Sequence, residues 1–90
     1  MIMEQPPVTR EGTIKKSLAG MRSAGKIDEG EFSAMGMLIT DSVLSRDAVA
    51  LRTAHDGLRK LYGQRRGNVI DTGRILGLID ITHWALRRVG

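Results

Sequence analysis

The chain has 90 residues, which is the size of a single small domain. Its 41% hydrophobic and 27% charged residues are typical of a globular protein and exclude an intrinsically disordered one. The chain contains no cysteine, which excludes disulfide bonds and metal sites built on thiolates.

The net charge of +4 is spread unevenly along the chain. Residues 1–45 carry five basic and six acidic side chains, whereas residues 46–90 carry nine basic and four acidic ones. Most of the excess is arginine, whose planar guanidinium group suits phosphates and carboxylates. The composition therefore permits nucleic-acid binding without requiring it.

The first eight residues predict a flexible arm, because Pro6 and Pro7 cannot join a helix interior. We expect residues 9–90 to form one helical domain. The N-terminus lacks the basic and apolar regions of a signal peptide, and no apolar run approaches the roughly 20 residues that a membrane-spanning helix needs. We therefore expect a cytoplasmic protein without a membrane partner.

The first predicted helix covers residues 13–24, with Thr13 as its N-cap and Gly25 just after its end. Apolar residues at spacings of four and three share one face of this helix: Ile14, Leu18 and Met21. The segment is short and polar, so its stability depends on packing against other helices.

The second predicted helix covers residues 29–44 and has the clearest pattern in the chain. Asp28, followed three residues later by Glu31, has the spacing of a capping box. The apolar residues that follow form one amphipathic stripe: Phe32, Met35, Ile39 and Val43.

The third predicted helix covers residues 46–62, with Ser45 as its N-cap and Gly63 at its end. Its apolar residues share one face: Leu51, Ala54, Leu58, Leu61 and Tyr62. Residues 64–67 form a basic connector to the last segment.

The C-terminal segment is ambiguous. Its spacing favours a helix over residues 72–88, although Gly73 and Gly77 each cost a helix about 1 kcal/mol relative to alanine. Residues 69–71 fit either a short strand or a helix start capped by Asn68, so a short β element near residues 69–81 stays an alternative.

Together the segments predict an all-α fold, a compact bundle of three to four helices. Two of the helices carry more apolar surface than one core-facing stripe requires. Five residues lie outside the stripes and are candidate partner-binding residues: Met37, Leu38, Leu44, Leu76 and Trp84. Trp84 is the strongest candidate, because tryptophan is enriched in binding hot spots. Burial of the same surface within a four-helix packing is an equally well supported alternative.

Catalytic and metal-binding patterns are weak in this sequence. His55 lies at the edge of an apolar face, which is typical of a structural histidine. Asp80 and His83 are close enough on a helix to contact one metal ion or each other, but two ligands do not make a site. The chain has no nucleophile motif and no phosphate-binding loop. We therefore expect no enzymatic activity, no bound metal and no cofactor.

Basic residues support a different hypothesis. Six of them are candidate phosphate contacts: Arg59, Lys60, Arg65, Arg66, Arg87 and Arg88. The chain has only one Phe, one Tyr and one Trp, which are too few for a base-stacking platform, and no helix-turn-helix spacing. Solvated helix ends, where basic side chains favour the helix dipole, explain the same residues better.

Two functional hypotheses follow from these patterns. The favoured one is a small non-enzymatic regulator or adaptor that inhibits or modulates a larger protein by binding it, as a homodimer. The alternative is an accessory protein that binds nucleic acid through phosphate contacts.

Overall fold

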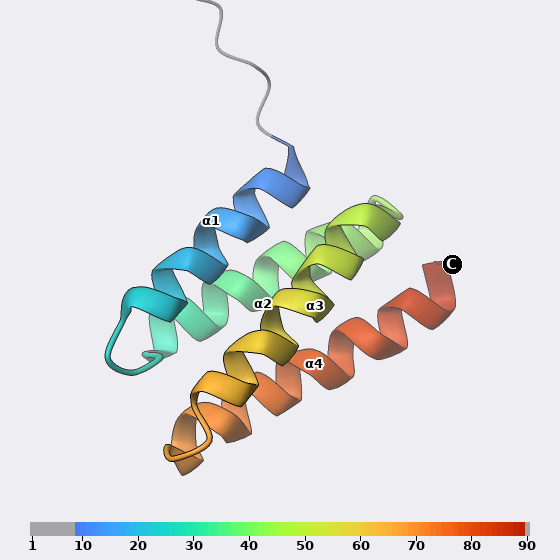
Figure 1. The fold of residues 1–90 in the computed structure, drawn as a ribbon. Coiled ribbons are helices and arrows are strands. Elements are labelled where there is room, and N and C mark those ends of the chain that lie inside the picture. Colours follow the sequence, from blue (N-terminus) through green and yellow to red (C-terminus); the bar gives the residue numbers. More distant parts are fainter. Residues whose placement is uncertain (1–8, 90) are drawn as a thin grey trace, which may run out of the picture.

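A computed structural model describes residues 9–89 and shows four helices (Figure 1). They are α1 (Arg10–Ser23), α2 (Glu29–Leu44), α3 (Ala48–Gln64) and α4 (Val69–Val89). The predicted all-α bundle is confirmed, and the part of the chain that the structure describes contains no strand. The predicted flexible arm, residues 1–8, lies outside the described residues.

Helix α1 begins three residues earlier than the sequence pattern predicted. Its N-cap is Thr9, whose Oγ1 accepts a hydrogen bond from the Gly12 amide at 3.0 Å. Thr13 was therefore the wrong cap, and its hydroxyl donates to the Thr9 carbonyl at 3.1 Å. The earlier start places Glu11 in the first turn, where its carboxylate favours the helix dipole. The helix ends at Ser23, with the C-cap at Ala24.

Helix α2 has the predicted bounds and the predicted cap. The Asp28 carboxylate accepts a hydrogen bond from the Glu31 amide at 2.7 Å. The predicted cap of α3 at Ser45 is wrong, because Ser45 is the C-cap of α2. Asp47 caps α3 instead, accepting from the Ala50 amide at 3.1 Å. Helix α3 therefore starts at Ala48, two residues later than predicted, and it continues past Gly63 to Gln64.

The β alternative near residues 69–81 is wrong, because α4 is helical from Val69 onwards. Asn68 caps it by accepting a hydrogen bond from the Asp71 amide at 3.1 Å. Residues at spacings of three and four along α4 are buried: Asp71, Ile75, Leu78, Thr82 and Ala85. This long buried face offsets the cost of Gly73 and Gly77, since tertiary packing supplies most of a helix's stability.

The four helices occupy the corners of a bundle. Helices α2 and α3 contact each other, and each of them also contacts α1 and α4. Helices α1 and α4 lie on opposite sides of the bundle and do not contact each other (Figure 1). Successive helices alternate in direction, so α2 and α4 begin at the same end of the bundle and run parallel (Figure 1). The largest fully buried apolar side chains come from all four helices and the α1–α2 loop: Ile14, Met21, Ile27, Met35, Ile39, Leu51, Leu58, Leu61, Ile75 and Leu78.

Helices α1 and α3 approach closely at Gly57. A methyl group added at Gly57 would overlap the Cδ1 atom of Leu18. Only glycine therefore lets Leu18 pack against the α3 backbone at this crossing. The sequence pattern did not identify Gly57, because a glycine within a helix gives no indication of what packs on it.

Candidate functional site

A groove runs between α2 and α4 on the surface of the bundle. Its apolar lining residues are Phe32, Met37, Leu44, Leu78 and Ile81. Its polar lining comes from Ser33, Thr40 and Asp41. Among the described residues that line the groove, Asp41 is the only charged one, and its carboxylate accepts a hydrogen bond from Arg10 Nε at 2.7 Å. Over residues 9–89 the groove is therefore an apolar surface, and the carboxylate of Asp41 in its lining is already paired.

The structure separates the five predicted partner-binding residues. Met37 is 73% exposed and Leu44 is 80% exposed, and both line the α2–α4 groove. Leu38 is half-buried and packs against the core. Leu76 and Trp84 are exposed on α4 but do not line the groove. The surplus apolar surface is thus divided between a groove and the outward face of α4.

Three exposed apolar residues of α4 were missed by the sequence pattern: Val69, Ile70 and Ile81. Ile81 is exposed and lines the α2–α4 groove, and Ile70 is 68% exposed at the start of the helix. Ile70 lies seven residues before Gly77 and fourteen before Trp84, so the three share one face. The spacing was available in the sequence, but the ambiguity between strand and helix at residues 69–71 concealed it.

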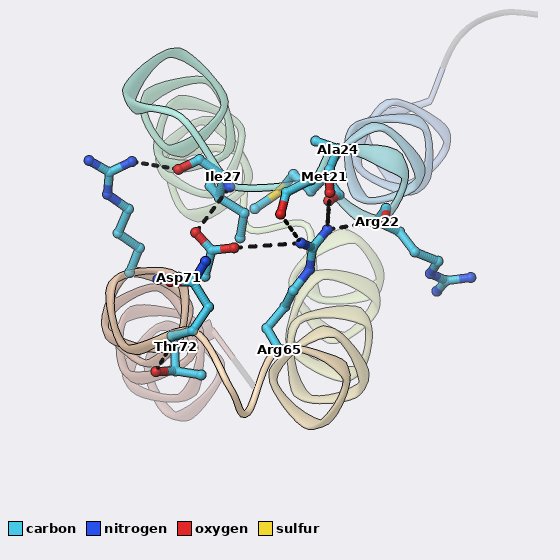
Figure 2. A network of polar contacts seen from close by, with 10 residues as sticks. Met21, Arg22, Ala24, Ile27, Arg65, Asp71 and Thr72 are labelled. Atoms are coloured by element: carbon cyan, nitrogen blue, oxygen red, sulfur yellow. Dashed lines mark hydrogen bonds and ion pairs between the residues drawn. The ribbon is translucent and has the colours of Figure 1, made fainter.

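A polar network closes the end of the bundle where the α1–α2 and α3–α4 loops meet (Figure 2). Arg65, the C-cap of α3, has a side chain that is only 14% exposed. Its guanidinium donates to backbone carbonyls at the end of α1: Met21 at 2.9 Å, Gly25 at 2.7 Å, Arg22 at 3.2 Å, and Ala24. Arg65 therefore satisfies carbonyls that the end of α1 leaves without partners.

Asp71 completes this network from the first turn of α4. Its side chain is buried, and Oδ1 accepts a hydrogen bond from the Ile27 amide at 3.0 Å. Its Oδ2 lies 3.6 Å from Nη1 of Arg65. Arg74, one turn along α4, donates to the Ile27 carbonyl at 2.6 Å. These contacts hold the α1–α2 loop against the start of α4.

The structure does not bring the six candidate phosphate contacts together. Arg59, Lys60 and Arg66 are exposed near the end of α3. The guanidinium of Arg65 is held by the carbonyls of α1 rather than open to solvent. Arg87 and Arg88 lie at the other end of the bundle, because α4 runs antiparallel to α3 for 21 residues. The basic residues therefore form two separate groups.

The histidines form a pair that the sequence did not indicate. The ring centroids of His55 and His83 are 6.0 Å apart, across the contact between α3 and α4. His55 Nδ1 also lies 3.8 Å from the carboxylate of Asp56. Within residues 9–89, no three His, Cys, Asp or Glu side chains are close enough to hold a metal ion. The pair therefore offers two ligands at most, and the predicted partnership of Asp80 with His83 finds no third member.

None of the described helices combines the length and the hydrophobicity needed to cross a bilayer. No protein-family model, curated protein or solved structure matches this chain. Two surfaces of the bundle carry clustered exposed apolar side chains, the α2–α4 groove and the outward face of α4.

Proposed function

We propose that this protein acts by binding a larger protein, not by catalysis, and that the partner docks in the α2–α4 groove. The observation that carries the proposal is the exposure of Met37, Leu44 and Ile81 along one apolar groove. Clustered exposed apolar side chains mark interaction sites more often than single ones do. Binding without catalysis is the mode of regulators and adaptors, and we propose such a role in the cytoplasm, with the protein acting as a homodimer.

The chemistry of the groove indicates the class of partner segment. Two parallel helices form its walls, and a further helix packs naturally between them when its apolar face points inward. Methionine adapts its shape to different apolar surfaces, and Met37 lies on the wall formed by α2. Asp41, the only charge in the described part of the lining, is paired with Arg10, so a charged partner surface gains little there. We therefore propose an amphipathic helix of the partner as the segment that docks.

Capture from a lysate of the organism that encodes the chain, followed by binding measurements with the purified partner, tests this function. We expect Met37→Glu and Leu44→Glu to abolish binding, because each puts a charge into the apolar groove. Val49→Glu is the matched control, since Val49 is an exposed apolar residue of α3 outside the groove. A partner that binds the two groove variants as tightly as the unaltered protein would contradict the proposal, and so would the failure to find any partner.

A further inference from the structure

Trp84 and Ile70 project from the same outward face of α4, on either side of Gly77. Trp84 is 54% exposed, and Ile70 is more exposed still. Gly77 lies midway, seven residues from each, so the face carries a large side chain at both ends and none at its centre. A methyl group added at Gly77 would meet no atom within 4 Å. Packing within one copy therefore does not require a glycine at this position, as it does not at Gly36, Gly63 or Gly73, and alanine would favour the helix by about 1 kcal/mol.

The two ends of this face differ in charge. Ile70 borders a hollow between the starts of α2 and α4, where Asp28 and Glu29 are also exposed. At the other end, the guanidinium of Arg88 lies 4.4 Å from the ring centroid of Trp84. The face is thus bordered by carboxylates where it begins and by arginine where it ends.

We propose that two copies of this chain form a dimer through this face, with their α4 helices antiparallel and a two-fold axis at Gly77. Such an axis places Trp84 of each copy on Ile70 of the other and brings the two Gly77 positions together. The absence of a side chain at Gly77 lets the two helix backbones approach closely. The contact is isologous, so each favourable pairing occurs twice.

The charges become complementary in the same arrangement. Arg88 is seven residues after Ile81, which lines the α2–α4 groove, so Arg88 projects toward the α2 side of α4. The two-fold axis places the α2 helices of both copies on the same side of the contact between the α4 helices. Arg88 of each copy therefore approaches the start of the other copy's α2, where Asp28 and Glu29 lie. A second copy fits this face because it supplies both the apolar residues and the opposite charges in the required order.

Two cations oppose the pairing. Lys26 borders the same hollow as Asp28 and Glu29. The exposed Arg66 lies eleven residues before Gly77, level with Arg88 across the axis, so both cations repel the approaching Arg88. The other cation that borders the hollow, Arg74, is already engaged, because its guanidinium donates to the Ile27 carbonyl and lies 5.9 Å from the ring centroid of Phe32. Lys26→Glu should therefore strengthen the dimer, an outcome that a purely apolar contact would not produce.

The proposal rests on the self-association that the proposed function includes, and sedimentation across a concentration series at low salt tests it. We expect a dimer whose dissociation constant rises about tenfold or more in Trp84→Ala, the cost of losing a hot-spot residue. Gly77→Leu should also dissociate the dimer, while circular dichroism shows an intact helical monomer. Leu76→Ala is the matched control, because Leu76 is exposed about 80° around α4 from Trp84.

A charge exchange gives the decisive result. Arg88→Glu and Glu29→Arg should each weaken the dimer, and the two substitutions combined should restore it. A monomer at every concentration overturns the proposal. A dimer whose dissociation constant is unchanged by Trp84→Ala, Gly77→Leu and the charge exchange overturns it too. A monomer that still captures a partner through Met37 refutes only the dimer, whereas a dimer that captures none refutes only the partner-binding function.

Discussion

Nη1 of Arg65 and Oδ2 of Asp71 lie 3.6 Å apart where the α3–α4 loop meets the α1–α2 loop. Each of the two side chains also forms hydrogen bonds with backbone groups of its own. Arg65 satisfies carbonyls at the end of α1, while Asp71 accepts from the amide of Ile27 before α2. Both side chains are largely removed from water. This ion pair and its hydrogen bonds thus join the end of α3 and the start of α4 to the loop between α1 and α2.

Arg65→Ala should lower the free energy of unfolding by about 3 kcal/mol, because it leaves the buried carboxylate of Asp71 unpaired and several carbonyls without a donor. Urea denaturation followed by circular dichroism measures the loss. Arg66→Ala is the control, since Arg66 is an exposed arginine at the next position. Equal effects of the two substitutions would show that the network does not contribute to stability.

Gly57→Ala should destabilise the protein by about 1–3 kcal/mol, because the new methyl group overlaps the buried side chain of Leu18, which must shift within the core. Gly63→Ala, in the same helix, should instead stabilise it by up to about 1 kcal/mol, since nothing lies within 4 Å of the added methyl group. Thermal unfolding of both variants checks the opposite signs. A stabilised Gly57→Ala variant would place the α1–α3 crossing elsewhere.

Met35→Ala should cost about 2–5 kcal/mol, because the Met35 side chain is fully buried and its truncation leaves a cavity. Met37→Ala, only two residues away, should leave the free energy of unfolding nearly unchanged, since Met37 projects into the open groove. Denaturant titration of the two variants compares one residue type on two faces of α2. Similar losses at both positions would mean that Met37 is covered in solution.

Nucleic-acid binding through Arg59, Lys60 and Arg66 is the alternative hypothesis, and a mobility-shift titration tests it. We expect no shifted band with a short DNA duplex at about 50 mM salt, because phosphate contacts must add up to produce affinity and the basic residues form two separate groups. A shift at low salt that Arg59→Ala removes would restore the alternative function. The dimer variants Trp84→Ala and Gly77→Leu serve as controls, since neither changes the charge.

The sequence by itself determined the helical class, the bounds and cap of α2, and most of the core. These features are local, because a stripe of apolar residues at spacings of three and four has one way to be buried along a helix. Asp28 could be assigned as a cap from its spacing to Glu31 alone. At Thr13 and Ser45 the local pattern predicted the wrong cap, because the side chains of Thr9 and Asp47 can cap a helix as well as those of Thr13 and Ser45.

Only the tertiary structure decided which apolar residues stay exposed and which cations are engaged. Leu38 and Met37 are neighbours in sequence, yet one packs against the core and the other lines the groove, because α2 has neighbours on some sides only. Arg65 and Arg66 are likewise adjacent residues of the same type, but Arg65 donates to carbonyls at the end of α1 whereas Arg66 is exposed. Contacts between residues more than forty positions apart depend on how the helices pack, and periodicity along one helix carries no information about its neighbours.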